Sequence, residues 1–405
     1  MRRRTFLRDG LLTGLGALCG PLLNLGRCRL DALQSVQVST RAVDLVLRST
    51  VVDMLCLLTL DWPRLFSWQR EPDRFALGEF RELESLGVDI FHPAVETGAR
   101  DPRDGVERWL RGWRRLLGSQ PCYLQPVETV TDLLQAPRLG KIGVIVGFQN
   151  ASHFQSAEDV AHFHAGGQRV AQLTYNAANR LGSGCLAPRD GGLTPLGAEV
   201  VAEMNRRGMA VDVSHCGERT SLEAIEASVR PVLVTHSNCA ALSPGQPRCK
   251  SDRVLRAMAT KGGVIGITLV RPFVKPSGAA TLADLLDHFD HVTRLVGVEH
   301  VGLGSDVDVA AVDPATGRPH PLYAIRGLDP RARVFQIADG LLARGYSEED
   351  VELVLGGNFL RALTAIWPDD SWELLSEREL RRDPFCPAAW PRGPAGPEPR
   401  GPATQ

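Results

Sequence analysis

A chain of 405 residues is long enough for one large domain or two medium ones. Its 43% hydrophobic and 23% charged residues are ordinary for a globular enzyme and exclude a disordered or fibrous protein. The formal net charge of −1 argues against nucleic acid or an anionic membrane surface as partners, because both attract strongly basic proteins.

The N-terminal segment differs from the rest of the chain. It begins MRRRTFLRDG and continues LLTGLGALCGPLLNLG, so paired arginines precede a weakly apolar, Gly-rich run. This pattern is typical of a twin-arginine export signal, and the apolar run is too short and too rich in glycine for a membrane span. We therefore expect residues 1–35 to be a signal, the protein to be periplasmic or extracytoplasmic, and the mature chain to have no transmembrane domain. The alternative is an ordinary basic N-terminus.

Between residues 45 and 365, β-rich apolar runs alternate with helical patterns. The strand candidates are 49–55, 87–94, 140–148, 169–175, 209–215, 231–236, 262–268 and 300–306. Helical stretches such as 196–208 and 251–263 lie between them, and Gly208 ends the first of these. Eight such β/α units predict an α/β fold of the TIM (β/α)8 barrel type with parallel strands. The rival, a doubly wound open sheet, needs a Gly-rich phosphate turn after an early strand, and the sequence has none.

Two further helices are predicted after the last strand candidate, within residues 329–345 and 347–363. Ser347 and Asp350 have the spacing of a capping box, which would start the second helix. Residues 366–405 are rich in Pro and Gly, so we expect a C-terminal extension that is largely disordered.

Polar side chains gather at the ends of the predicted strands, where barrel enzymes keep their chemistry. These strand-end residues are His92, Gln149, Asn150, Tyr175, Asn176, His215, His236 and Asp306. One strand–helix–strand repeat separates His215 from His236, which predicts two imidazoles side by side, as in half of a zinc site. A single histidine of this kind is more often a hydrogen-bonded core residue, but the convergence of several polar residues indicates a site.

Six segments, in order, carry a resemblance to a known family: DGGLTPLGAEVVAEMNRRGMAVDVSH, THSN, RCKSD, AMATKGGVIGI, DHFDHVTRLVGVEHVGLGSDVD and GGNFLRAL. The chain resembles the membrane (renal) dipeptidase family of zinc peptidases over residues 45–365, and most closely over 170–310. The resemblance implies a TIM barrel with a binuclear zinc site that hydrolyses dipeptides. Some members of the family accept D-residues at the C-terminal side of the substrate or open β-lactams. Members often dimerise, so the resemblance also implies a homodimer.

The resemblance also implies roles for single residues. His215 and His236 match the two histidines that hold the second zinc ion, and Asp306 matches the active-site aspartate near the first zinc ion. Arg248 most nearly matches the arginine that pairs with the substrate's C-terminal carboxylate, although the loop before it is longer here. Tyr175 stands where animal members carry a histidine that contacts the substrate.

Three metal ligands of the family are replaced in this chain. Leu55 and Leu57 stand at the histidine and the final aspartate of the first-strand motif D-x-H-x-D, and Gln149 replaces the bridging glutamate. Leucine binds no metal, and a neutral amide binds zinc poorly and supplies no negative charge. The two or three ligands that remain suffice for one zinc ion with a bound water, but not for two ions. Candidates for a further ligand are His92, Cys216 and Cys239.

Two functions follow from these observations, and both remain open. In the first, the chain is an exported dipeptidase-like metallohydrolase with one zinc ion on His215 and His236, and Asp306 is the general base. In the second, it is a non-catalytic barrel that binds a small peptide-like ligand or acts as a maturation factor, and the two histidines are relics. A metal-free enzyme with different chemistry is a third alternative.

Overall fold

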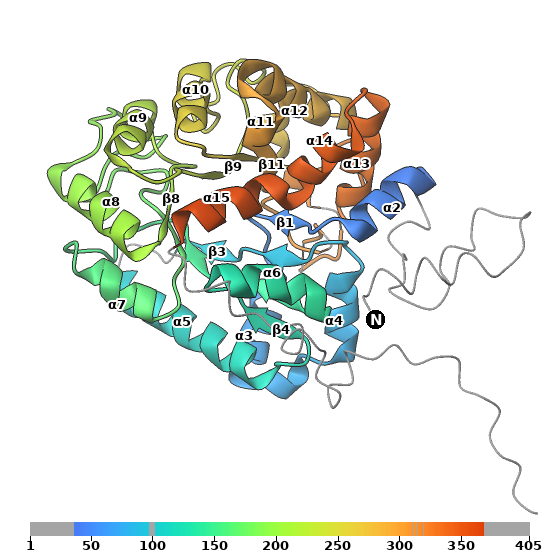
Figure 1. Cartoon of the computed structure of the whole chain (residues 1–405), viewed down its shortest axis with the longest axis horizontal. Coiled ribbons are helices and arrows are strands. Elements are labelled where there is room, and N and C mark those ends of the chain that lie inside the picture. The colour runs from blue at the N-terminus through green and yellow to red at the C-terminus, as the bar shows by residue number, and fades with distance from the viewer. Residues whose placement is uncertain (1–35, 97–101, 310, 314, 319, 368–405) are drawn as a thin grey trace, which may run out of the picture.

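The computed structural model describes residues 36–96, 102–309, 311–313, 315–318 and 320–367. The predicted export signal (residues 1–35) and nearly all of the predicted C-terminal extension lie outside the described residues, so both stay predictions. Figure 1 shows an α/β arrangement with strands at the centre and helices around them. Among the described helices, none has the length and apolar character that a membrane span requires.

Every predicted strand run overlaps at least one observed strand. The strands are β1 (Val52–Asp53), β2 (Ile90–Phe91), β3 (Ala94–Val95), β4 (Leu124–Pro126), β5 (Ile142–Val144), β6 (Gly147–Phe148), β7 (Val170–Gln172), β8 (Ala210–Asp212), β9 (Val234–Ser237), β10 (Ile265–Ile267) and β11 (Val301–Leu303). All pairs between these strands are parallel, so the predicted α/β fold with parallel strands is confirmed. Strand β4, which pairs with β5, lies outside the predicted strand runs.

The strand pairings close on themselves. One set has the order β4-β5-β2-β1-β11-β10-β9, and the other has the order β3-β6-β7-β8. Because β2 leads into β3 and β5 leads into β6, the two sets are continuous. A parallel bridge between Asp212 and Leu233 joins β8 to the residues that enter β9, which completes the ring. A ring of parallel strands brings all the carboxyl ends of its strands to one mouth.

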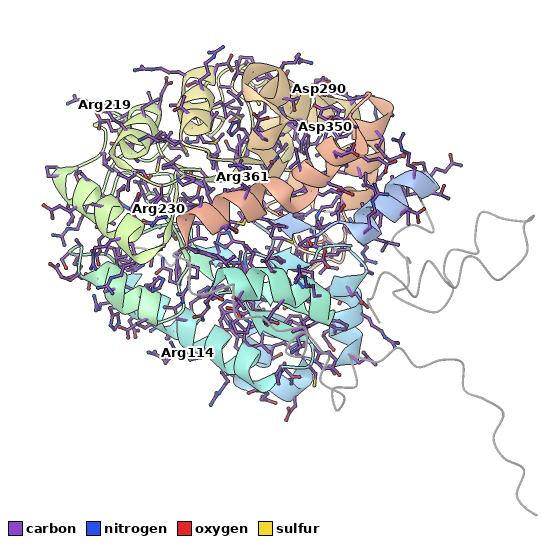
Figure 2. The ribbon with its side chains drawn as sticks, in the orientation of Figure 1. Arg114, Arg219, Arg230, Asp290, Asp350 and Arg361 are labelled. Atoms are coloured by element: carbon purple, nitrogen blue, oxygen red, sulfur yellow. The ribbon has the colours of Figure 1, made fainter. Side chains whose placement is uncertain are left out.

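Helices surround this ring, as Figure 1 shows. They are α2 (Thr40–Arg48), α3 (Trp62–Arg70), α4 (Leu77–Glu84), α5 (Pro102–Ser119), α6 (Val130–Leu139), α7 (Asp159–Ala165), α8 (Pro195–Arg207), α9 (Glu218–Ala227), α10 (Asp252–Thr260), α11 (Arg271–Val274), α12 (Leu282–Val296), α13 (Arg333–Ala343), α14 (Glu348–Glu352) and α15 (Asn358–Ile366). Charged side chains such as Arg114, Arg219 and Asp290 project from their outer faces (Figure 2).

Local sequence sets the helix ends. Thr194 caps α8 with its side chain, and Gly208 ends that helix in the left-handed region at a φ of 75°, as predicted. The predicted capping box at Ser347 begins α14. A π-helical turn, Leu353–Gly357, then joins α14 to α15.

Helix α15 closes the end of the ring at which the strands begin, and it crosses the centre of Figure 1. Its buried face packs with the first residues of the strands, in an apolar cluster that includes Val52, Ile90, Val170, Ala210, Val264, Phe359, Leu363 and Ile366. The Phe359 ring lies against Gly302 of β11, where a Cβ atom would come within 2.7 Å of the ring. Apolar side chains fill this end of the ring, so a polar site has to lie at the other end, where the strands finish.

Phe359→Ala should therefore destabilise the fold strongly. The side chain is 0% exposed, and truncation of a buried phenylalanine costs about 3–5 kcal/mol. Urea unfolding of the variant measures this loss. Thr364→Ala, on the exposed face of the same helix, is the control and should change stability by less than about 0.5 kcal/mol. Equal losses in the two variants would contradict the role of α15 as a plug.

Candidate active site

His215 and His236 lie side by side at the mouth, as the sequence predicts. His215 follows β8 and His236 lies in β9, and their Nε2 atoms are 3.1 Å apart. The two ring centroids are 5.1 Å apart. Both side chains are buried, with exposed fractions of 6% and 0%. The pair therefore occupies fixed positions on rigid strand ends.

The partners of the two Nδ1 atoms decide which ring nitrogens carry hydrogen. The Thr235 hydroxyl donates to the Asp212 carboxylate at 2.7 Å, so towards His236 it can only accept. His236 Nδ1–H therefore donates to Thr235 Oγ1 at 2.9 Å. His215 Nδ1–H donates to the side-chain oxygen of Asn176 at 2.8 Å. Both Nε2 atoms are then left with a lone pair, and these lone pairs face each other.

Two lone pairs at 3.1 Å repel each other unless a cation or a proton lies between them. A tetrahedral zinc ion, with Zn–N bonds of about 2.0–2.1 Å, holds two imidazole nitrogens about 3.3 Å apart. Burial and then the charge of Arg248 lower the pKa of both His215 and His236, which keeps the rings neutral as ligands must be. The spacing of the pair is therefore compatible with two ligands of a divalent metal ion, one fewer than the three protein ligands of a typical catalytic zinc site.

The structure brings only these two ligands together. Within residues 36–367, as far as they are described, no three His, Cys, Asp or Glu side chains form a group that could hold a metal ion. A third ligand from Asp306, Cys216 or Cys239 is not assembled with the two histidines among these residues, and it stays a prediction. The Cys239 thiol donates to the His288 carbonyl at 3.7 Å, and burial raises the pKa of the Cys216 thiol to about 11. Both sulfurs are packed as neutral thiols.

His92 is a third imidazole in the interior of the ring, but it does not complete a ligand group with His215 and His236. Its Nδ1–H donates to the Met54 carbonyl at 2.6 Å. Its Nε2 atom is buried and has no partner among the described residues. Burial lowers the pKa of His92, so this ring is neutral as well.

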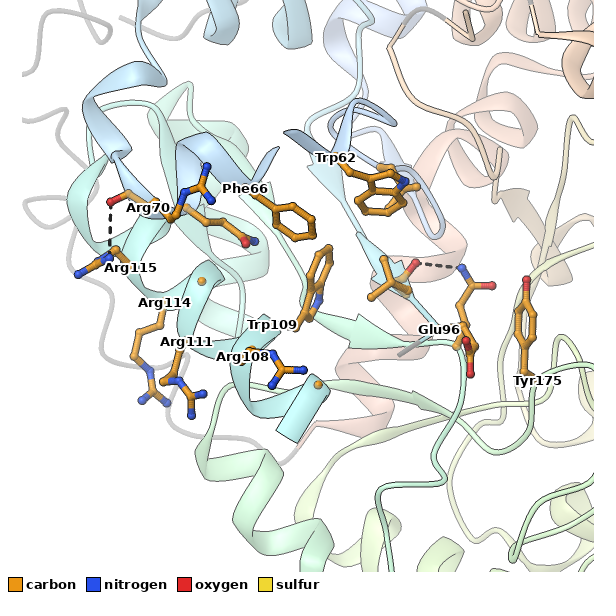
Figure 3. A pocket seen from close by; sticks show the side chains of 17 residues that line it. Trp62, Phe66, Arg70, Glu96, Arg108, Trp109, Arg111, Arg114, Arg115 and Tyr175 are labelled. Carbon is orange, nitrogen blue, oxygen red and sulfur yellow. Dashed lines mark hydrogen bonds between the residues drawn. The ribbon is translucent and has the colours of Figure 1, made fainter. Parts of the chain in front are cut away.

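Leu55, Leu57 and Gln149 carry neutral side chains, and their correspondence to the family's metal ligands stays a prediction. Leu55 and Leu57 are 1% and 8% exposed. The side-chain amide of Gln149 donates to the Ala94 carbonyl at 2.9 Å, a contact drawn in Figure 3. None of these three residues offers a charged oxygen or an imidazole to a second metal ion, and the residues present do not fit one.

A buried ion pair lies beside these neutral side chains, and the sequence analysis did not identify it. Asp53, the first residue of the first-strand motif, lies 3.6 Å from the guanidinium of Arg333, and both side chains are 1% exposed. Arg333 also donates to the Pro330 carbonyl at 2.7 Å and to the Cys56 sulfur at 3.0 Å. Burial raises the pKa of Asp53, and the Arg333 charge opposes this rise. The guanidinium of Arg333 therefore supplies the positive charge beside Asp53.

Asp306 lies between the two sides of the mouth. Its backbone has a φ of 58°, which is unusual for a residue other than glycine, and its N–H donates to the Leu55 carbonyl at 2.7 Å. Burial raises the pKa of Asp306 to about 7, although the charge of Arg248 opposes this rise. A carboxyl group of this kind can accept and release a proton near neutral pH.

Arg248 and Tyr175 complete the set of predicted site residues. Arg248 is 3% exposed, and its two terminal nitrogens donate to the backbone carbonyls of Ser214 at 2.5 Å and His236 at 2.7 Å. Each of these nitrogens has one further N–H. The Tyr175 ring stacks on His215, with centroids 4.2 Å apart and planes 24° apart. Both residues therefore border the histidine pair, and their roles toward a substrate stay predictions.

Two buried residues next to the site, Asp212 and Lys250, were not predicted from the sequence. Asp212 could have been found, because it lies three positions before His215 and ends the same strand. Lys250 is 3% exposed, and its ammonium donates to the Cys216 carbonyl at 2.8 Å and to the Ser221 hydroxyl at 3.2 Å. Burial lowers the pKa of Lys250 to about 8. No local pattern in the sequence points to this buried lysine.

Comparisons with known proteins agree with the resemblance in the sequence. Residues 83–368 match the family described as membrane dipeptidase (peptidase family M19). The dipeptidase aclJ of Aspergillus oryzae is 33% identical over 258 residues, which are 62% of this chain but only 58% of that protein. The dipeptidase verJ of Clonostachys rogersoniana is 31% identical over 308 residues, which are 73% of this chain and 70% of that protein.

Solved structures are similar over most of the chain. An amidohydrolase from Pseudomonas aeruginosa is 28% identical with a TM-score of 0.67, and the match covers 81% of this chain and 99% of that chain. A metallopeptidase from Rhodobacter sphaeroides, solved with a phosphinate mimic of the dipeptide L-Ala-D-Ala, has a TM-score of 0.62 and covers 79% and 99%. Its identity is 19%, so it shows a similar fold and no more.

Asp306→Asn tests the raised pKa of this carboxyl group. The folded state holds the proton to about pH 7, whereas an ordinary aspartate loses it near 3.8, so ionisation costs stability as the pH rises through this window. Asparagine stays uncharged and avoids that cost. We expect the variant to melt several degrees above the wild type at about pH 8, and close to it at about pH 4. Asp73→Asn, at an exposed position, is the control, and the same gain at both pH values would contradict the prediction.

Proposed function

The chain belongs to the membrane dipeptidase family, and from this premise we propose that it is a dipeptidase-like metallohydrolase that uses one metal ion. The observation that carries the proposal is the pair of Nε2 lone pairs that face each other across 3.1 Å. Leu55 and Leu57 offer no ligands for a second ion. The proposal includes a (β/α)8 barrel as the scaffold and action in an extracytoplasmic compartment, reached through residues 1–35.

In this proposal, His215 and His236 would hold a divalent metal, which polarises an amide carbonyl and lowers the pKa of its bound water when present. Asp306 takes a proton from the attacking water and returns it to the leaving amine, since its pKa is about 7. The remaining N–H groups and the charge of Arg248 bind the carboxylate of the substrate's C-terminal residue. Burial raises the pKa of Tyr175, so its phenol stays protonated and can donate to the developing oxyanion.

A non-catalytic barrel is the second candidate, and one observation favours it. The described part of the chain contains no three-ligand metal group, and Arg333 already supplies a cation beside Asp53. Such a protein would bind a peptide-like ligand through Arg248 without turnover, or would assist the maturation of another molecule.

Metal analysis separates the two candidates. Protein purified without chelators should contain about one zinc ion per chain, and it should hydrolyse members of a dipeptide panel with zinc, manganese or cobalt added. His215→Ala removes one of the two ligands, so both metal and hydrolysis should be lost. His162→Ala, an exposed histidine on α7, is the control and should retain both. If the wild type contains no metal and cleaves no dipeptide, the hydrolase proposal fails, and saturable binding that Arg248→Ala weakens would support the second candidate.

Restoration of the replaced ligands gives a converse test. Leu55→His, Leu57→Asp and Gln149→Glu, introduced together, should add a second metal ion per chain, because they supply the charged and imidazole ligands that the apolar side lacks. The metal content per folded chain measures this directly. Leu55→Ala/Leu57→Ala is the matched control, since it removes the leucines without adding ligands. An unchanged metal count in the triple variant would mean that these positions do not face the site.

A further inference from the structure

A groove between α3 and α5 opens directly onto the candidate site (Figure 3). Its volume is about 1200 Å³, and Leu57, Gln149 and Tyr175 line the end that meets the site. Typical small-ligand sites measure about 300–1,000 Å³, so a free dipeptide would leave much of this groove unfilled. The groove therefore suits a ligand that extends well beyond the reacting amide.

The middle of the groove is aromatic. Trp62 and Phe66 project from α3 with ring centroids 6.3 Å apart, and Trp109 of α5 lies 6.5 Å from Trp62. Trp62 and Phe66 are 38% and 44% exposed, which is unusual for side chains of this size in a folded protein. Aromatic side chains recognise other rings by offset or edge-to-face contact. This part of the groove favours an aromatic group on the ligand.

Two buried hydrogen-bond donors also line the groove. Trp109 and Gln69 are 6% and 7% exposed, yet Trp109 Nε1 and Gln69 Nε2 have no acceptor anywhere in the described chain. An unpaired buried donor costs about 1–3 kcal/mol, so a ligand acceptor would be favourable once either side chain turns its buried nitrogen towards the groove. Gly112 of α5 makes room for this amide, because a Cβ atom there would lie 2.5 Å from Gln69 Oε1. Backbone carbonyls of a peptide are suitable acceptors.

The far end of the groove is positively charged. Five arginines and one glutamate are the charged residues of its lining, and in Figure 3 the arginines lie on the side away from Tyr175. The glutamate, Glu96, lies at the opposite end and accepts a hydrogen bond from Asn150 at 3.2 Å. Arg108 and Arg111 are paired with Asp104 and Glu107, so the charge available to a ligand comes from Arg70 on α3 and from Arg114 and Arg115 on α5. This field attracts a carboxylate and repels a free ammonium group.

We propose that the groove binds the N-terminal part of the substrate, and that this substrate is an N-acylated peptide rather than a free dipeptide. An aromatic residue precedes the reacting amide and lies among Trp62, Phe66 and Trp109. The carbonyl of the acyl group accepts from an unpaired donor that turns towards the groove, and a carboxylate on the acyl group lies near the arginines. The position of the reacting amide rests on the proposed function, whereas binding in the groove can be measured without turnover.

Four probes test the inference: acetyl-Gly-Ala, acetyl-Phe-Ala, succinyl-Gly-Ala and succinyl-Phe-Ala, each with an N-methylated amide before alanine that resists hydrolysis. Calorimetric titration of the purified holoprotein gives their affinities. We expect phenylalanine to tighten binding about tenfold over glycine, because its ring is buried among aromatic side chains. We expect the succinyl carboxylate to add about fivefold over acetyl, and this gain should vanish at high salt.

Variants assign each gain to its part of the groove. Trp62→Ala/Phe66→Ala should remove most of the phenylalanine gain, and Arg70→Gln/Arg115→Gln should remove the succinyl gain. The substituted positions are exposed, so the fold should tolerate these changes, and circular dichroism checks this. Val229→Ala, at a position 84% exposed, and Arg253→Gln on α10 are the matched controls and should leave both gains intact.

Probe affinities that agree within about threefold, or groove variants that weaken all four probes equally, would overturn the inference. Hydrolysis of the unmethylated peptides is measured separately. Hydrolysis without any preference for phenylalanine or succinyl contradicts the groove and leaves the proposed function standing. The expected binding preference without any hydrolysis contradicts the proposed function and leaves the groove standing.

Discussion

The Asp212 carboxylate determines the geometry on which the whole candidate site depends. One of its oxygens accepts from the backbone N–H groups of Ser214 at 2.9 Å and Thr235 at 3.1 Å, so it joins the ends of the two strands that carry the histidines. Its other oxygen accepts from the Thr235 hydroxyl, which in turn orients His236. A single buried carboxylate thus sets both the spacing of the imidazoles and the nitrogen that carries the lone pair. Partners of this kind commonly tune the ligands of metal sites.

Charges are balanced in different ways on the two sides of the mouth. On the histidine side, facing lone pairs favour a cation between the strands. On the other side, Leu55 and Leu57 exclude charge, and the guanidinium of Arg333 compensates the buried Asp53. Arg333 of α13 therefore supplies the positive charge next to Asp53 that a bound metal ion would otherwise supply. In the proposed function, this asymmetry is the physical reason to expect one metal ion rather than two.

The apolar side also connects the mouth to the groove between α3 and α5. Leu57 and Gln149 line the end of the groove that meets the site, so these uncharged residues form a floor along which a long ligand can lie. In the proposed function, the strand ends hold the reacting amide and the two helices hold the remote part of the substrate. Binding energy from remote groups can position a reacting bond, which matters where a site has few ligands of its own.

The sequence alone determined the alternation of strands and helices, the neighbouring histidines and the apolar residues at positions 55 and 57, because each depends on local pattern or on one β/α repeat. It did not reveal β4 or the ion pair between Asp53 and Arg333, whose partners lie at opposite ends of the chain. It also gave no sign of the groove, since Trp62 and Trp109 meet only when α3 packs on α5. Tertiary packing decided these features, because contacts between distant segments depend on how whole elements fit together, and no short stretch of residues encodes that fit.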